Sequence, residues 1–194
     1  MDLHTFLRTR RSVRRFKPDP VPASVVERIL ETSIHAPSAH NLQPWRFAII
    51  RADSYKSALG KALTEKMCTD MTAKGASNEE IEKRVKVSLQ RIDEAPVVIL
   101  LCRDTNAIRT EEPEEHIMGI QSVALAGLQV MLAAHAEDLG SNWICWPLYA
   151  QEETRSALNL PDNWQPQGMF FIGHADETHK EKILKSVDEV TITL

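Results

Sequence analysis

The chain has 194 residues and a net charge of −4, with 43% hydrophobic and 26% charged residues. This composition is typical of a soluble globular protein, and the length fits one domain over residues 1–194. The negative net charge excludes a molecule whose surface as a whole attracts nucleic acid, so we expect no nucleic-acid partner.

Cysteine and histidine usage limits the chemistry further. Cys68, Cys102 and Cys145 are far apart and form no Cys-x-x-Cys motif. They are therefore expected to be reduced thiols in a cytoplasmic protein. The seven histidines are scattered, without metal-ligand spacing to cysteine or carboxylate, so no metal site is expected. The sequence also names no protein nucleophile or general base.

A basic segment follows the first predicted helix, which covers residues 2–10. Six of the ten residues from Arg8 to Lys17 are cationic. A local cluster of this kind indicates a local anion, and the planar arginine fork suits phosphate. Two alternatives remain, a solvated basic turn and a nucleic-acid contact, although the segment has no aromatic platform beyond Phe16.

A polar loop comes next, between a predicted helix over 23–35 and a predicted strand over 45–50. It runs from Ala36 to Phe47, and its side chains Ser38, Asn41 and Gln43 are neutral hydrogen-bonding groups. Groups that both donate and accept suit a polar heterocycle better than a metal or a strong charge. The alternative is an ordinary helix-to-strand loop, because serine, asparagine and proline are common loop residues.

The middle of the chain predicts two helices, a buried strand and a loop. Asp53 or Ser54 is expected to cap a helix to Thr72, and a capping box from Ser77 to Glu80 begins a second helix that Pro96 ends. The apolar run 97–101 predicts a central strand. Residues 103–115 are polar and predict a loop.

The predicted helix over 114–138 is the least polar of the chain. Its stretch 117–134 carries no charge but contains Gln, Ser, Gly and many Ala residues, a composition poor for a bilayer span. We therefore expect no membrane partner. A helix that is apolar nearly all round must be buried nearly all round, here in the core and at a subunit interface.

The last part of the chain predicts three short elements and a tail. They are a strand and turn over 140–147, a helix over 151–158 and a strand over 168–174. The tail carries Lys180, Lys182 and Lys185, and its last five residues alternate like a strand that could pair with another sheet edge.

Four segments, in this order, resemble the signature of the nitroreductase family of FMN-dependent oxidoreductases. They are Arg10–Phe16, the loop from Ala36 to Phe47, Leu139–Ile144 and the tail Lys185–Val190. The resemblance implies an α+β fold with a mixed sheet flanked by helices. It also implies an intertwined homodimer with FMN at the subunit interface, where the apolar helix and the tail lie.

The resemblance also implies roles for particular residues. Those expected to hold the FMN phosphate and ribityl chain are Arg10, Arg11, Ser12 and Arg14, completed by Lys182 or Lys185. Those expected to line the flavin, some from the partner subunit, are Pro37, Ser38, Asn41 and Gln43. Backbone groups near Trp143, Ile144 and Cys145 are expected to face the isoalloxazine.

The implied activity is NAD(P)H oxidoreduction in two hydride-transfer steps, first from NADPH or NADH to the flavin and then to a nitroaromatic, quinone or similar acceptor. Residues 79–96, 143–144 and 160–168 further resemble the flavin domain fused to the γ-glutamyl ligase of deazaflavin coenzyme biosynthesis. This suggests a second activity, the reduction of a deazaflavin precursor. The sequence is also compatible with a flavin-binding sensor without significant turnover and with a non-flavin interaction protein.

Overall fold

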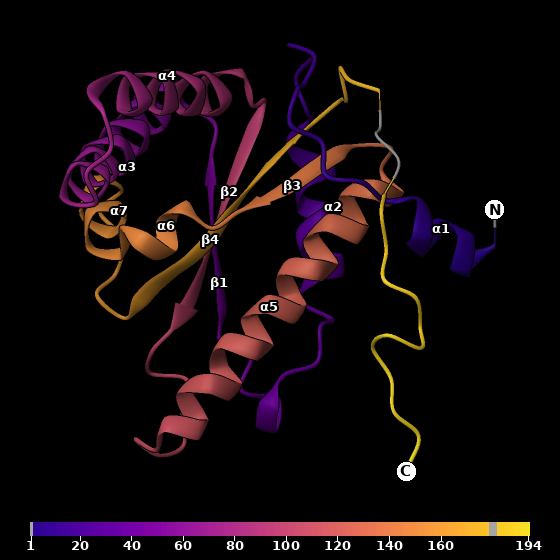
Figure 1. Ribbon diagram of the computed structural model, residues 1–194. Helices are drawn as coiled ribbons and strands as arrows, with labels where there is room; N and C mark the ends of the chain where they lie inside the picture. Colours follow the sequence, from indigo (N-terminus) through magenta and orange to yellow (C-terminus); the bar gives the residue numbers. More distant parts are fainter. Residues whose placement is uncertain (1, 179–181) are drawn as a thin grey trace.

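The computed structural model describes residues 2–178 and 182–194. Its centre is a four-stranded sheet in the order β1-β2-β4-β3, and each neighbouring pair is antiparallel (Figure 1). The strands are β1 (Trp45–Ile50), β2 (Val97–Asp104), β3 (Gly140–Ile144) and β4 (Trp164–Gly173). Ser12, outside these strands, adds a parallel bridge to Ser141. The predicted α+β fold with a sheet flanked by helices is confirmed, whereas the sheet is mixed only through this bridge, because its four strands pair antiparallel throughout.

Helices cover both faces of the sheet, as the colours of Figure 1 allow the reader to follow. The helices are α1 (Leu3–Thr9), α2 (Ala23–Ser33), α3 (Asp53–Ala73), α4 (Asn78–Glu94), α5 (Pro113–Ala136), α6 (Trp146–Tyr149) and α7 (Gln151–Ala157), with a short 3-10 helix η1 (Ala39–Asn41). All eight residues of β2 are buried. Alternate β2 side chains pack toward α2 and α5 on one face and toward α3, α4 and α7 on the other.

Three sequence predictions need correction. The segment 103–115 is not all loop, because β2 continues to Asp104 and α5 begins at Pro113. Arg103 is buried and donates to the backbone oxygen of His116 at 3.0 Å. This charged residue therefore lies within the strand, although its polarity predicted a loop. The N-cap of α3 is Ala52, without a side-chain bond, rather than Asp53 or Ser54. Finally, β4 begins at Trp164, four residues before the predicted start.

Helix α5 is long and apolar enough to cross a membrane by length and composition, as core helices also can be. Here it packs against α2 and the sheet, and nine of its residues are buried. A Cβ at Gly127 would lie 2.1 Å from Cζ3 of Trp143. This glycine therefore lets the indole of Trp143 in β3 enter the space beneath α5.

The capping box at the start of α4 is confirmed and gives a testable stability contribution. The Ser77 hydroxyl accepts from the Glu80 backbone N–H at 3.3 Å, and the Glu80 carboxylate accepts from the Ser77 N–H at 3.0 Å. We expect Ser77→Ala to lower the free energy of unfolding by about 1 kcal/mol. Urea unfolding followed by circular dichroism measures this, with the exposed Ser57→Ala in α3 as control. An unchanged midpoint would contradict the cap's contribution.

The C-terminal tail, residues 182–194, is irregular, with one hydrogen-bonded turn in which Val190 donates to Val187 at 3.1 Å (Figure 1, yellow). Its apolar side chains are exposed, from Ile183 at 98% to Ile192 at 82%. The tail forms no strand within the described part of this single chain. Exposure of so many apolar groups on one segment is typical of a surface that another chain covers.

Candidate functional site

The basic segment lies along the outer edge of β3. Val13 donates from its backbone to Ser141 at 3.0 Å, and Lys17 donates to His174 at 2.9 Å. The side chains of Val13 and Phe16 are buried in the core on the α3 and α4 face. Backbone pairing and these two apolar anchors hold the segment extended, so the intervening cationic side chains are displayed along a fixed edge of the sheet.

Arg10 has a side-chain donor that lacks a hydrogen-bond partner in the part of the chain that the structure describes. Its Nη1 atom is buried and has no hydrogen-bond partner within the described residues. Burial, followed by the nearby charge of Arg11, lowers the pKa of the Arg10 guanidinium. A buried donor without an acceptor is costly, and an anion is the partner that relieves both the missing bond and the charge repulsion. Arg10 therefore fits a phosphate.

Arg11 and Arg14 point to different surroundings. Arg11 donates to the backbone oxygens of Arg8 at 2.6 Å and Arg10 at 3.0 Å, and it lines with Arg10 a cavity of about 180 Å³ near the end of α5. Arg14 lines a separate cavity of about 510 Å³ beside α4. Ser12 is exposed between them. The single chain therefore does not gather the predicted phosphate ligands into one cavity.

The polar loop has an unusual backbone. His40, Asn41 and Gln43 have φ values of 51°, 55° and 49°, in the left-handed region that non-glycine residues rarely adopt. The Ser38 hydroxyl accepts from the Gln43 backbone N–H at 3.1 Å, and the Gln43 amide donates to the Asn41 oxygen at 3.2 Å. Pro37 precedes this network and is exposed. Strained backbone of this kind clusters at binding sites, which supports the functional interpretation of the loop.

The loop and Arg10 are far apart in one chain. Next to Arg10, the Thr9 hydroxyl lies 3.1 Å from Nε2 of His135, near the end of α5. The Ala39 backbone N–H instead donates to Ser122 at 3.1 Å, further back on the same helix. Thirteen residues of helix separate Ser122 from His135, a rise of about 20 Å. The two predicted halves of the site thus lie near opposite ends of α5.

The end of β3 separates its side chains between the two faces of the sheet. Trp143 packs edge-on against Phe170, with ring centroids 5.1 Å apart, beneath α5. Ile144 and Cys145 line a cavity of about 230 Å³ on the opposite face, together with Trp146. Of the three residues predicted to face the isoalloxazine, Ile144 and Cys145 therefore have side chains on this cavity and Trp143 does not. The role predicted for the backbone here stays a prediction.

Sequence reasoning missed the residues that α3 and α4 contribute to this cavity. Met67, Arg84, Ser88 and Arg91 line it with Cys145. The spacing of 84, 88 and 91 places three polar groups on one face of α4, and this periodicity was the available signal. In the tail, Lys182 and Lys185 are exposed, and no ion pair involves either within the residues described, while Lys180 lies outside those residues.

The cysteines differ enough in environment to give distinct reactivity. Burial raises the pKa of the Cys102 thiol to about 12, whereas Cys145 is exposed. Because the thiolate is the reactive form, we expect iodoacetamide at pH 8 to label Cys145 and leave Cys102 unmodified in the native protein. Peptide mass spectrometry measures both sites, and labelling in guanidinium provides the positive control. Native labelling of Cys102 at the rate of Cys145 would contradict this placement.

Comparison with known proteins identifies the family. The nitroreductase family matches residues 7–174. The chain is 28% identical to YfhC of Bacillus subtilis, provisionally named an NAD(P)H nitroreductase, over 93% of this chain and 88% of YfhC. It is 30% identical to 5,6-dimethylbenzimidazole synthase of Rhodobacter capsulatus, over 92% of this chain and 86% of the synthase.

A solved structure supports the same assignment at the level of the fold. The chain is similar to a nitroreductase from Desulfovibrio desulfuricans crystallised with FMN, with a TM-score of 0.79 and 24% identity. The match covers 100% of this chain and 97% of that one. The segment-by-segment resemblance, the sheet with helices on both faces and the family match over most of the chain agree. This chain belongs to the nitroreductase family.

Proposed function

We propose that this protein is a single-domain, FMN-dependent NAD(P)H oxidoreductase that reduces a nitroaromatic, quinone or similar acceptor by two-step hydride transfer. The observation that carries the proposal is the buried Nη1 of Arg10, which has no hydrogen-bond partner in the described part of the chain, on a fixed basic edge. The FMN bound to the similar Desulfovibrio protein and the NAD(P)H in the provisional name of YfhC support the cofactor and the donor. The dispersed free cysteines support a reducing compartment such as the cytoplasm.

The residues present fit FMN by their chemistry. Arg10, with Arg11, Ser12 and Arg14 nearby, would hold the phosphate end, because arginine forks and a hydroxyl match its oxygens. Ser38, Asn41 and Gln43 would donate to and accept from the polar edge of the flavin ring, after Pro37 fixes the entry to the loop. When bound, FMN supplies the redox chemistry that the side chains lack. The protein's part is to bind, orient and exclude water.

A homodimer is part of this proposal. In one chain the loop and Arg10 are separated along α5, so a second copy is the simplest source of the missing half. The exposed apolar side chains of α5 and of the tail, including Ile117, Leu128 and Ile192, supply a surface for that copy. Lys182 or Lys185 would then reach the phosphate end from the tail.

Deleting residues 183–194 tests the dimer. We expect the full-length protein to have twice the chain mass by light scattering and the truncated protein to be monomeric, because the tail's apolar groups lose their cover. The truncated protein should also release FMN. A variant with only Asp188 and Glu189 changed to alanine keeps the apolar groups and serves as the control. A dimer of unchanged affinity after truncation would remove the tail from the interface.

The activity itself is tested by spectroscopy. Purified protein should be yellow, and NADPH or NADH should bleach it under anaerobic conditions. Addition of a quinone or a nitroaromatic should restore the colour. A yellow protein that neither donor bleaches would instead favour the flavin-binding sensor. A colourless protein that does not bind added FMN would refute the whole proposal and favour an interaction protein that uses the basic segment.

A further inference from the structure

A second cavity opens beside Ile144 and Cys145, in the space between α3, α4 and α6. Its volume is about 480 Å³. It shares Met67, Arg84, Trp146 and Tyr149 with the cavity that Ile144 and Cys145 line, so the two cavities adjoin. We call the two together the α3–α4 pocket. It is large enough for a small organic molecule and begins at the segment proposed to face the flavin.

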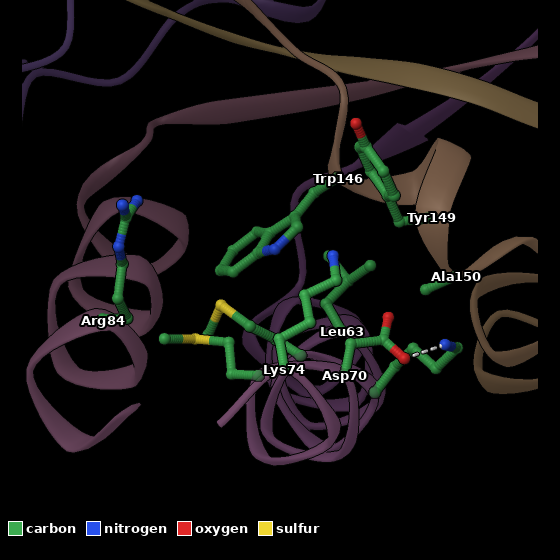
Figure 2. Close-up of a pocket in the computed structure, with 10 residues that line it drawn as sticks. Leu63, Asp70, Lys74, Arg84, Trp146, Tyr149 and Ala150 are labelled. Carbon is green, nitrogen blue, oxygen red and sulfur yellow. Dashed lines mark hydrogen bonds and ion pairs between the residues drawn. The ribbon is translucent and has the colours of Figure 1, made fainter. Parts of the chain in front are cut away.

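The α3–α4 pocket offers an aromatic and thioether wall. Trp146 and Tyr149, the first and last residues of α6, both line the pocket (Figure 2). Met67 and Met71 of α3 add two polarizable, adaptable side chains. Sulfur atoms and an indole face pack favourably against a planar ring, and methionines adjust to its outline. This wall therefore suits a flat aromatic molecule.

The charges around the pocket are unbalanced. Lys66 is 2.5 Å from the carboxylate of Asp70, so these two charges neutralise each other. Lys74 and Arg84 also line the pocket, and among the described residues neither has an ion pair within 4 Å. Figure 2 shows Arg84 rising from α4 on the side of the pocket opposite Tyr149. Arg84 interacts electrostatically with Glu80, one turn earlier on α4, but no carboxylate of the described residues lies within 4 Å of it. Its planar fork beside an aromatic wall therefore suits an anionic group attached to a ring.

We propose that the α3–α4 pocket binds the electron acceptor and selects a planar aromatic molecule with an anionic substituent, carboxylate or phosphate. The ring lies against Trp146 and the two methionines, and Arg84 pairs with the anion. This assignment rests on the proposed function, because it specifies the acceptor of that reaction. Arg84 is thus a specificity-determining residue, and Lys74 adds positive potential without a fixed geometry.

Matched acceptors test the proposal in the oxidative half-reaction, where the anionic nucleotide donor is absent. Photoreduced protein is mixed with 4-nitrobenzoate or with the neutral 4-nitrobenzamide. We expect the wild type to be oxidised faster by the anion than by the amide. Arg84→Gln should reduce this ratio of rates about tenfold, the effect expected from the loss of one charge-assisted hydrogen bond. Lys86→Gln removes the same charge from an exposed position on the same helix and should leave the preference unchanged.

Equilibrium binding separates the pocket from the redox chemistry. Calorimetry with the non-reducible benzoate, phenyl phosphate and benzamide should show tighter binding of the anions, with the tighter of the two anions identifying carboxylate or phosphate as the substituent. Arg84→Gln should remove this difference, and Trp146→Leu should weaken all three ligands alike. If no acceptor is reduced and no ligand binds, both proposals fail. If both nitro compounds are reduced with a ratio that Arg84→Gln leaves unchanged, only this inference is overturned.

Discussion

Replacing Arg10 with alanine should give a protein that is purified without FMN and binds added FMN about 100-fold more weakly. Truncation removes a charge-assisted, forked hydrogen-bond donor from the phosphate, and such bonds contribute about 1.5–3 kcal/mol. Because Nη1 has no partner within the described residues, the same change removes an unsatisfied buried donor from the protein without FMN. The folded state should therefore keep its thermal stability while it loses the cofactor. Flavin absorbance and equilibrium dialysis measure the first effect, and calorimetric melting measures the second.

Two variants make the Arg10 result specific. Arg8→Ala removes an exposed positive charge from the end of α1 and should retain stoichiometric FMN. Arg10→Lys keeps the charge but loses the planar fork, so its affinity should lie between those of the wild type and Arg10→Ala. Arg14→Ala should also weaken FMN binding. If Arg10→Ala and Arg14→Ala both keep stoichiometric flavin, the phosphate assignment is wrong.

Gly127→Ala should destabilise the protein by about 3 kcal/mol, although alanine normally favours a helix interior by about 1 kcal/mol over glycine. The added Cβ would lie 2.1 Å from Cζ3 of Trp143 and 3.1 Å from Cδ2 of Leu101. Both neighbours are held between the sheet and α5, so neither can move aside cheaply. For a chain of this length the change should lower the melting temperature by roughly 10 °C, as differential scanning calorimetry measures.

A second substitution distinguishes this clash from a general defect of α5. Trp143→Leu opens space beneath Gly127 and should itself cost stability, because a large, partly buried ring that packs against Phe170 is lost. In the double variant the added methyl group then fills part of that space. We expect the two substitutions to be strongly non-additive, with Gly127→Ala nearly harmless in the Trp143→Leu background. Simple additivity, or a higher melting temperature for Gly127→Ala alone, would show that the indole does not constrain this position.

Much of the fold was predictable because hydrophobic periodicity and capping act locally. Trp45–Ile50 was predicted with its observed bounds, and the Ser77 capping box fixed the start of α4. The errors lie where a distant residue overrides the local signal. Arg103 looks like a loop residue until His116 of α5 accepts its hydrogen bonds, and the start of α3 has no capping side chain at all.

The candidate site was predictable as a set of residues but not as a geometry. The neutral polar groups of the Ser38–Gln43 loop marked it as a candidate site in the sequence. Its three residues with left-handed backbone could not be predicted, because the loop contains no glycine. The polar face of α4 was visible only as periodicity. Its meaning depends on Trp146, which tertiary folding brings opposite Arg84 across the pocket. The separation of Arg10 from the loop along α5 likewise follows from packing between elements remote in sequence.

The strand order has a consequence for biosynthesis. The last strand, β4, lies between β2 and β3, so it carries the hydrogen bonds that join the two halves of the sheet. In a nascent chain that ends before residue 164, β3 and the Ser12 segment can pair with each other but have no strand that joins them to β2. We therefore expect the chain to acquire protease resistance only after β4 emerges, in one late step rather than progressively from its amino end.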